Sequence, residues 1–411
     1  MMVDALVTNA ADRSRPAAVA EGANVLQAVV ALQPVIRDCQ DEIERGIRIP
    51  ALLVERLRAL GLYRMTVPRT LGGLQLDLLT FLRAVELSAE ADGSVGWNLV
   101  NNAINQLVAL SLPDAGTRDI FADRPDPIVA GTVVPGGGRA TAVHGGYLVT
   151  GCWRFGTGCQ EAQWFLGNFG VWDGDQPRRH PNGTPVVWRS FFPRGECSIV
   201  ESWNVTGMRG TGSHDWSVEG VFVPERRAVP IPPTPFVNQW QRWPGALYAL
   251  PVQALLGPHH SVVATGIARA AIDALAALAA AKVPRGRSGV LRDNPQVQEW
   301  VARAEALLGA GQAFRTAVTG DIWNTVVAGR PTTLDQRARC RLASVYAVDS
   351  ARQAMDLMFR AGGSTSTEHG QRLERCWRDL NVVAQAATVV PEWYPVTGRV
   401  FLHLEPDPRL G

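Results

Sequence analysis

The chain has 411 residues, 46% hydrophobic and 19% charged, and its 40 basic and 38 acidic side chains leave a net charge of +2. This length predicts two or three packed units, and the balanced charge favours neither a nucleic-acid partner nor a membrane surface. Six scattered cysteines without a CxxC pair indicate no metal cluster and fit a reducing cytoplasm. No apolar run reaches the roughly 18 residues that a membrane helix needs.

We expect residues 1–16 to be a flexible leader, because they lack the pattern of a signal peptide. Residues 17–125 are expected to form an N-terminal α-helical domain. Apolar residues recur at helical spacing from Val25 to Ile36, and Gly61 is placed to end the next helix. Ser94 is the expected N-cap of the fourth helix.

From Pro125 the composition changes to Gly, Val, Thr and Trp, and short apolar runs alternate with turn signals. Residues 126–235 therefore predict a central antiparallel β-domain, a sandwich or small barrel. Residues 236–411 return to four long helical stretches on short links, which predict a C-terminal four-helix bundle. The expected fold class is mainly α with a central β-domain.

Four motifs stand out in this plan: ADGSVGW at 91–97, WRFGTG at 153–158, GMRGTGS at 207–213, and RAGGSTSTEHGQRLERCWRDL at 360–380. In this order and at these separations they resemble the acyl-CoA dehydrogenase superfamily, from residue 25 to the C-terminus. The WRFGTG and GMRGTGS forms are most similar to the two-component flavin-dependent monooxygenases, such as the oxygenase component of p-hydroxyphenylacetate hydroxylase.

The resemblance implies a homotetrameric hydroxylase that acts on a small-molecule substrate. Reduced flavin, FMNH2 or FADH2, would come from a separate NAD(P)H-dependent flavin reductase and react with O2. The resulting flavin C4a-(hydro)peroxide would transfer one oxygen to the substrate. The protein would position the reactants and exclude water.

The same resemblance implies the residues that hold the flavin. Phe155 would lie against the isoalloxazine and Thr157 near N5, while the backbone of Gly131 and Thr132 would face the ring. From the residues alone, Phe155 is equally a core residue of the β-domain and Thr157 a turn residue.

A second set would reach the flavin of a neighbouring subunit. The resemblance places Gly362 and Gly363 close to that flavin, and Arg285 with Gln298 at its phosphate. The two glycines are equally well explained as the C-cap of a helix. Arg287 or Arg292 could take the place of Arg285.

Two further residues are candidates for catalysis. The family places the segment of Arg209 at the mouth of the active site, although a solvated loop arginine is the alternative. His214 adjoins the same motif and could act as a base, although a surface histidine is the alternative. Arg378 and Asp379 predict an ion pair that orients the last helix.

Differences from the family limit the reactions that this chain could catalyse. Relatives that hydroxylate phenols carry histidines where this chain has Ile104, Glu161 and the run Gln385–Ala386–Ala387, so a base for the phenol proton is missing. Acyl-CoA dehydrogenases carry a catalytic glutamate at Ala387 or early in the first bundle helix, where residues 253–257 hold no acid. Oxygen chemistry is therefore favoured.

Polar side chains predict the substrate pocket, which would be lined by Asn98, Asn102, Ile104, Glu161, Gln385 and Ala386. Amides form hydrogen bonds but take no proton, which favours an amine or a polycyclic aromatic or polyketide substrate. Local pairing of these amides with backbone is the alternative. An acyl-CoA dehydrogenase-like FAD oxidoreductase, an amino-sugar N-oxygenase and a non-catalytic member remain the other hypotheses.

Overall fold

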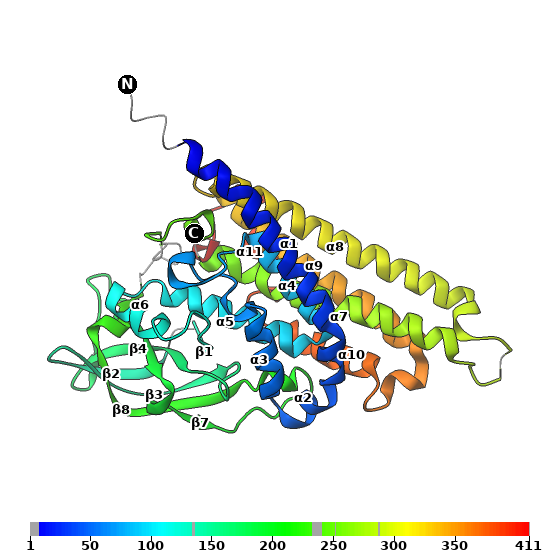
Figure 1. The fold of residues 1–411 in the computed structure, drawn as a ribbon, viewed down its shortest axis with the longest axis horizontal. Coiled ribbons are helices and arrows are strands. Elements are labelled where there is room, and N and C mark those ends of the chain that lie inside the picture. Colours follow the sequence, from blue (N-terminus) through cyan, green and yellow to red (C-terminus); the bar gives the residue numbers. More distant parts are fainter. Residues whose placement is uncertain (1–7, 134–135, 232–240, 251, 287, 411) are drawn as a thin grey trace.

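The computed structural model describes residues 8–133, 136–231, 241–250, 252–286 and 288–410 (Figure 1). The first helix begins at Thr8, well before the expected start at residue 17, and the helical stretch from Val25 breaks at Cys39. The N-terminal helices are α1 (Thr8–Asp38), α2 (Gln40–Gly46), α3 (Ala51–Ala59), α4 (Leu78–Ala91), α5 (Gly93–Ala109) and α6 (Asp114–Phe121). Helix α6 was not predicted.

Helix α5 is capped by Asp92 and not by Ser94. The Asp92 carboxylate accepts hydrogen bonds from the backbone N–H groups of Ser94 at 2.9 Å and Val95 at 3.3 Å. A carboxylate at this position satisfies orphan donors and complements the positive end of the helix. The other carboxylate oxygen lies 2.7 Å from Arg375, so the cap also ties α5 to the bundle.

The strands form one mixed sheet in the order β7-β8-β3-β2-β4-β6-β9, in which β1 and β2 both pair parallel with β4. The purely antiparallel arrangement that we expected is therefore wrong. The strands are β1 (Val129–Gly131), β2 (Gly137–Val143), β3 (Gly146–Gly156), β4 (Trp164–Asp173), β5 (Gln176–Pro177), β6 (Val187–Pro193), β7 (Ser198–Val200), β8 (His214–Pro224) and β9 (Ala228–Pro230). One face carries an aromatic core in which Trp153 stacks on Trp216 at 4.3 Å and Phe192 packs against both.

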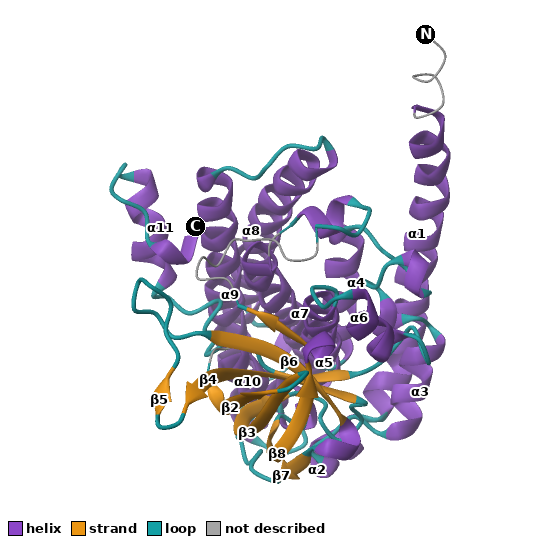
Figure 2. Ribbon diagram, turned by 90° about the vertical axis from the view of Figure 1, so that its left-hand side faces the viewer, coloured by secondary structure: helices purple, strands orange, loops and turns teal. Residues whose placement is uncertain are grey.

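The C-terminal part is a bundle of long helices that run side by side (Figures 1 and 2). They are α7 (Val252–Ala281), α8 (Pro295–Val327), α9 (Leu334–Gly362), α10 (Arg372–Val383) and α11 (Trp393–Phe401). The last expected helical stretch, residues 373–390, is helical only as far as Val383, where α10 ends, and α11 was not predicted. The boundary expected at residue 235 lies outside the described residues.

Helix α7 is the one described helix that is long and apolar enough to cross a membrane by composition, from Ala254 to Ala281. It packs against α4 and α9, and 67% of its most apolar window is buried inside the protein. A core helix of a bundle passes the same test of composition, so the helix is explained by its place in the fold.

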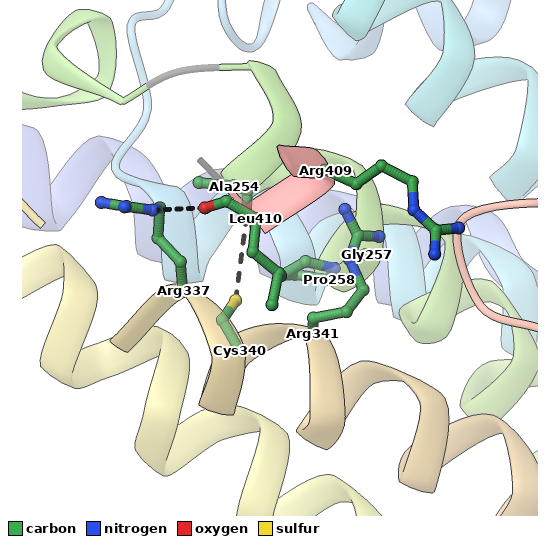
Figure 3. A pocket seen from close by; sticks show the side chains of 8 residues that line it. All are labelled: Ala254, Gly257, Pro258, Arg337, Cys340, Arg341, Arg409 and Leu410. Atoms are coloured by element: carbon green, nitrogen blue, oxygen red, sulfur yellow. Dashed lines mark hydrogen bonds between the residues drawn. The ribbon is translucent and has the colours of Figure 1, made fainter. Parts of the chain in front are cut away.

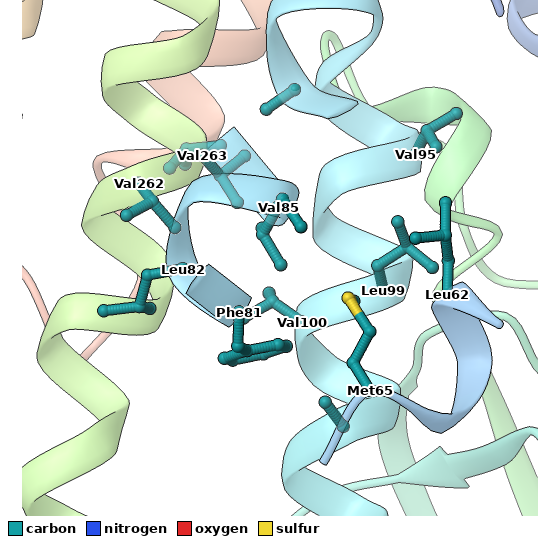
Figure 4. Close-up of a cluster of buried hydrophobic side chains, with 14 of the residues drawn as sticks. Leu62, Met65, Phe81, Leu82, Val85, Val95, Leu99, Val100, Val262 and Val263 are labelled. Carbon is teal, nitrogen blue, oxygen red and sulfur yellow. The ribbon is translucent and has the colours of Figure 1, made fainter. Parts of the chain in front are cut away.

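An apolar core joins the N-terminal helices to the bundle (Figure 4). Side chains of α4, α5 and α7 meet there, among them Phe81, Val85, Leu99, Val100, Val262 and Val263. Each fully buried side chain of this size contributes about 1.5–3 kcal/mol, so the interface holds α5 rigidly. This helix is what positions the candidate site against the sheet.

The expected fold class, mainly α with a central β-domain between a helical domain and a helix bundle, is confirmed.

Candidate active site

The end of β3, just before the turn that begins at Thr157, presents an aromatic side chain to solvent. Phe155 has a φ of 66° and is 49% exposed, and its ring meets Trp203 edge-on at 6.2 Å. A positive φ is uncommon for a bulky residue and such strain gathers at functional sites. The alternative of a core residue is therefore wrong for Phe155, because its ring is half exposed and has the guanidinium of Arg154 4.7 Å from its centre.

Behind this turn lies a row of three hydroxyl groups, which we call the hydroxyl row: Thr157, Ser213 and Thr211. Thr157 Oγ1 lies 2.9 Å from Ser213 Oγ, which lies 2.8 Å from Thr211 Oγ1. All three side chains are buried. Sequence reasoning found Thr157 but missed the other two, although both belong to the GMRGTGS motif.

The asparagines of α5 hold the sheet in place. Asn102 accepts the Val129 N–H at 2.8 Å, while Asn98 donates to the carbonyl of Ser94 at 2.9 Å. Asn105, which we also expected to line or flank the pocket, donates to the Val129 carbonyl at 2.8 Å. The alternative of local pairing with backbone is thus what the structure shows for Asn98, whereas Asn102 pairs with the backbone of a distant strand.

The same contacts position the turn after β1. Gly131 has a φ of 116°, and an added Cβ would overlap the Leu166 carbonyl, so glycine is required there. The Thr132 N–H donates to that carbonyl at 3.1 Å. The two residues predicted to face the flavin with their backbone are therefore fixed between α5 and β4.

A small cavity of about 10 Å³ lies between α5 and the turn after β3, lined among others by Asn98, Gly158, Glu161 and Thr211. It has room for a single water. Glu161 points its carboxylate at Arg48, 2.9 Å away. Ile104, another expected wall of the pocket, is only 3% exposed and lies inside the helical domain. These side chains therefore enclose no substrate-sized space here.

The turn after α10 carries Gln385, which is exposed, and Ala386, which is half-buried. Two residues further on, the hydroxyl of Thr388 lies 2.6 Å from Nδ1 of His260, whose ring stacks on Trp97 at 4.5 Å. Burial lowers the pKa of His260 to about 3, so this imidazole is neutral. Sequence reasoning missed His260, because the pair His259–His260 matches none of the motifs.

The residues expected to reach a neighbouring flavin gather at the far end of the bundle, at the right of Figure 1. Lys282 Nζ donates to the Gly362 carbonyl at 2.6 Å and to the Thr365 hydroxyl at 2.8 Å. Arg285 is exposed in the following loop, and Gln298 donates to the Arg292 carbonyl at 3.0 Å. The described chain thus brings this set together, but apart from Thr157.

Gly363 is the C-cap of α9 with a φ of 61°, so the capping explanation holds for this position.

Two family models match the chain: "Acyl-CoA dehydrogenase, N-terminal domain" over residues 27–120 and "Acyl-CoA dehydrogenase, C-terminal domain" over residues 259–391. The chain belongs to the acyl-CoA dehydrogenase superfamily. The indole-3-acetate monooxygenase of Pseudomonas putida is 31% identical over 89% of this chain and 90% of its own length. The flavin-dependent monooxygenase oxygenase subunit HsaA of Rhodococcus jostii RHA1 is 30% identical over 89% of this chain and 95% of its own.

Among solved structures, the 3-HSA hydroxylase from Rhodococcus sp. RHA1 has a TM-score of 0.86 at 27% identity, covering 94% of this chain and 99% of its own. Within the acyl-CoA dehydrogenase superfamily, the chain therefore belongs to the branch of flavin-dependent monooxygenases. The predicted family, branch and flavin cofactor are confirmed.

The described residues fit a flavin. The exposed ring of Phe155 offers a stacking surface and Thr157 offers a hydroxyl at the rim of the same turn. At the far end, Lys282 and Arg285 place cationic groups where an anionic phosphate would be stabilised. A bound flavin would supply the reaction with O2.

His214 is not placed to act as a base. Its Nδ1 accepts hydrogen bonds from the backbone N–H groups of Ser202 and Trp203, both at 3.1 Å. Burial lowers the pKa of His214, which keeps the ring neutral. The geometry corrects our prediction: this histidine anchors the segment before GMRGTGS, and the alternative of a surface histidine is also wrong, because the side chain is buried.

Arg209 is tied to the N-terminal domain. Its guanidinium donates to the carbonyl of Val205 at 3.2 Å and lies 3.5 Å from the Glu44 carboxylate. The predicted pair of Arg378 with Asp379 is also wrong: Arg378 binds Glu374 and Glu44, while Asp379 accepts the N–H of Met208. Arg209 therefore positions the GMRGTGS motif and does not act as a free cation.

A further pocket, of about 10 Å³, lies where the chain end (Pro408–Leu410) packs on α7 and α9 (Figure 3). Arg337 Nε donates to the Leu410 carbonyl at 2.8 Å, and Cys340 Sγ lies 3.8 Å from the Ala254 carbonyl. This space holds no more than one water and belongs to the packing of the C-terminus. Among the described residues, no three His, Cys, Asp or Glu side chains gather as a metal site.

Proposed function

We propose that this chain is a cytoplasmic homotetramer that hydroxylates a small aromatic compound with reduced flavin from a separate reductase. The observation that carries the proposal is the turn in which exposed Phe155 stands beside the hydroxyl row of a flavin-dependent monooxygenase. Phe155, Trp203 and Trp97 provide aromatic surfaces that suit an aromatic substrate better than an amine. The Pseudomonas putida relative is named for such a compound, indole-3-acetate.

Different residues of this chain would hold a proton, exclude water and bind the substrate. Thr157 would hold a proton at the flavin N5 through its hydroxyl, with Ser213 and Thr211 fixing the orientation of that hydroxyl. The buried segments around Gly131 and Gly158 would exclude water from the reacting atoms. Neutral His260, with one ring nitrogen lacking a protein partner among the described residues, could hydrogen-bond the substrate without charging.

The dehydrogenase hypothesis lacks its base. Ala387 stands at the position of the family glutamate, and its carbonyl accepts a hydrogen bond from Trp393 Nε1 at 2.8 Å. The next acid, Glu392, is exposed at the start of α11. Neither residue can remove a proton from a buried thioester.

Two arguments support the assembly and the compartment. Gly362 and Arg285 lie at the far end of the bundle from Thr157, so a flavin held by all three would need a neighbouring subunit. All six cysteines are free, as expected in a reducing cytoplasm. Light scattering of the purified protein should give four times the 44.5 kDa chain mass.

Rapid mixing tests the activity. The protein is mixed anaerobically with reduced FMN, and separately with reduced FAD, and then with oxygenated buffer. We expect an absorbance distinct from both reduced and oxidised flavin to persist before oxidised flavin appears. One atom from 18O2 should then enter an aromatic product such as hydroxylated indole-3-acetate.

Reoxidation of both flavins at the rate of the free flavin would overturn the proposal. Bleaching of tightly bound oxidised FAD by an acyl thioester without O2 would instead restore the dehydrogenase hypothesis. Thr157→Ser is the matched control, because it keeps the hydroxyl and should keep the transient absorbance.

A further inference from the structure

The hydroxyl row leads from the candidate flavin site into the interior of the protein. Thr157 Oγ1 lies 2.9 Å from Ser213 Oγ, which lies 2.8 Å from Thr211 Oγ1. A hydroxyl both donates and accepts a hydrogen bond. A proton that enters such a row at one end can therefore leave at the other while each oxygen keeps one proton. Whether the row can serve as a proton path depends on what lies beyond Thr211.

Thr211 also lines the small cavity between α5 and the turn after β3. The cavity has a volume of about 10 Å³, which is room for one water, and Asn98, Gln160 and Glu161 line it together with Thr211. A buried water needs roughly two to four polar partners, and these side chains can supply them. A water in this cavity would extend the hydroxyl row by one step.

Glu161 is the side chain of this cavity that can take up a proton near neutral pH. Asn98 and Gln160 carry amides, which do not titrate. Burial raises the pKa of Tyr63, so its phenol keeps its proton. The guanidinium of Arg48 stays charged. A proton that reaches the cavity along the row would therefore arrive at the Glu161 carboxylate.

Glu161 connects the cavity with solvent. Its carboxylate lies 2.9 Å from Arg48, and the two side chains are 23% and 44% exposed, respectively. A carboxylate at this place can exchange protons with bulk water. The turn holds it there: the Glu161 N–H donates to the Gly158 carbonyl at 3.1 Å, and the Gly158 N–H donates to the Thr211 carbonyl at 2.9 Å. Both ends of the path are thus fixed to the turn that carries Thr157.

We propose that the hydroxyl row, one water and Glu161 form a proton relay between the flavin and solvent. The inference rests on the proposed function and assigns its proton path. Regeneration of oxidised flavin requires one proton to leave N5. Thr157 would accept this proton and give its own hydroxyl proton to Ser213. The same exchange at Ser213, Thr211 and the water delivers one proton to Glu161, which releases it to bulk water. No electron moves in the relay, and every hydroxyl is restored.

The first test needs no flavin. A high-resolution crystal structure of the flavin-free protein should show one water in the cavity, within hydrogen-bond distance of Thr211 Oγ1 and of the Glu161 carboxylate. A cavity without this water would overturn the relay. A water that reached only one of the two groups would overturn it as well.

The second test is the sign of a kinetic change. Glu161→Gln removes the proton acceptor and Thr211→Val interrupts the row, so each should lengthen the life of the transient absorbance by about 10-fold or more. If the row only oriented Thr157, Thr211→Val should instead shorten that life. A shortened or unchanged life in Glu161→Gln would overturn the relay. Because Glu161 is partly exposed, this variant decides the question even if Thr211→Val does not fold.

Two controls separate proton transfer from a structural effect. Glu305 also pairs with an arginine, Arg269 at 2.8 Å, but it lies on α8, and Glu305→Gln should leave the transient unchanged. Formate added to Glu161→Gln should restore most of the wild-type rate, because a small carboxylate can carry the proton at the exposed end of the path. A lengthened transient that formate does not shorten would overturn the relay.

The wild type separates this inference from the proposed function. A transient absorbance in the wild type with the same life in Glu161→Gln and Thr211→Val would overturn the relay and leave the monooxygenase intact. Absence of the transient in the wild type itself would overturn the proposed function, and the relay with it.

Discussion

The side-chain oxygens of Thr157 and Ser213 lie 2.9 Å apart, although Thr157 directly follows β3 and Ser213 directly precedes β8. Ser213 is in turn held by Thr211 at 2.8 Å. The position of the Thr157 hydroxyl is thus set by a second motif, 56 residues along the chain. In such a row each hydroxyl polarises the next one, so the hydrogen bonds strengthen one another.

Thr157→Val should therefore shorten the life of the oxygen-reactive flavin without unfolding the protein. Valine has the same shape but no hydroxyl, and one charge-assisted hydrogen bond is worth about 1.5–3 kcal/mol, so the flavin should reoxidise at least tenfold faster. Stopped-flow absorbance measures this rate, and the yield of hydrogen peroxide should rise in parallel. Thr157→Ser should behave as the wild type, whereas unchanged reoxidation in Thr157→Val would contradict the role.

His214 offers a second prediction, because it accepts two backbone N–H groups through one nitrogen. His214→Ala would leave both donors without an acceptor and should lower the free energy of unfolding by about 1–3 kcal/mol. His214→Asn should recover much of this loss, since Oδ1 of asparagine can stand where Nδ1 stood. Urea unfolding measures both variants.

The pH dependence of activity provides the control for His214. Burial lowers the pKa of His214 from its ordinary value, which favours the neutral ring near pH 7. The pH–rate profile of His214→Asn between pH 6 and 8 should therefore match the wild type. Loss of an acid limb in that profile would show that His214 takes a proton in the reaction.

Local features of the site were visible in the sequence, whereas long-range ones were not. The turn at Phe155 and Thr157 is a contiguous motif, and helical periodicity located α4 and α5. The parallel pairing of β1 and β2 with β4 depends on contacts between distant segments, so alternation alone could not reveal it.

Charged and polar partners were the hardest to predict. Arg209 and Arg378 both form ion pairs with Glu44. Glu44 is more than 160 residues away from each arginine, and no spacing rule links the arginines to it. Asn98 and Asn102 looked like pocket residues because their helix was placed correctly, but their partners lie on backbone.

Gly210 yields a third prediction about packing. An added Cβ would overlap Ile43 of α2, so Gly210→Ala should force α2 from the GMRGTGS motif and lower stability by about 1–3 kcal/mol. Gly309 is the matched control in the exposed middle of α8, where an added Cβ meets nothing within 4 Å. Gly309→Ala should raise stability by up to about 1 kcal/mol. Thermal unfolding of the pair would contradict the packing argument if both changes had the same sign.

Asp379 yields the last prediction, which concerns pH. Burial raises the pKa of this carboxyl to about 7, against the opposing effect of Arg375, and the group accepts the backbone N–H of Met208. Because its folded pKa exceeds its unfolded value near 3.9, the folded state binds the extra proton between these limits. The stability that Asp379 contributes is therefore present in acid and is lost as the pH rises toward 7.

Asp379→Asn keeps the acceptor for Met208 and removes the titration. From pH 5 to pH 8, the free energy of unfolding of the wild type should fall relative to Asp379→Asn by about 2–3 kcal/mol. Asp175→Asn is the control, because the Asp175 side chain is 99% exposed and should change nothing. A difference in the free energy of unfolding that stayed constant from pH 5 to pH 8 would contradict the prediction. It would mean that Arg375 keeps Asp379 ionised, so that the contacts between α10 and the GMRGTGS motif do not depend on pH.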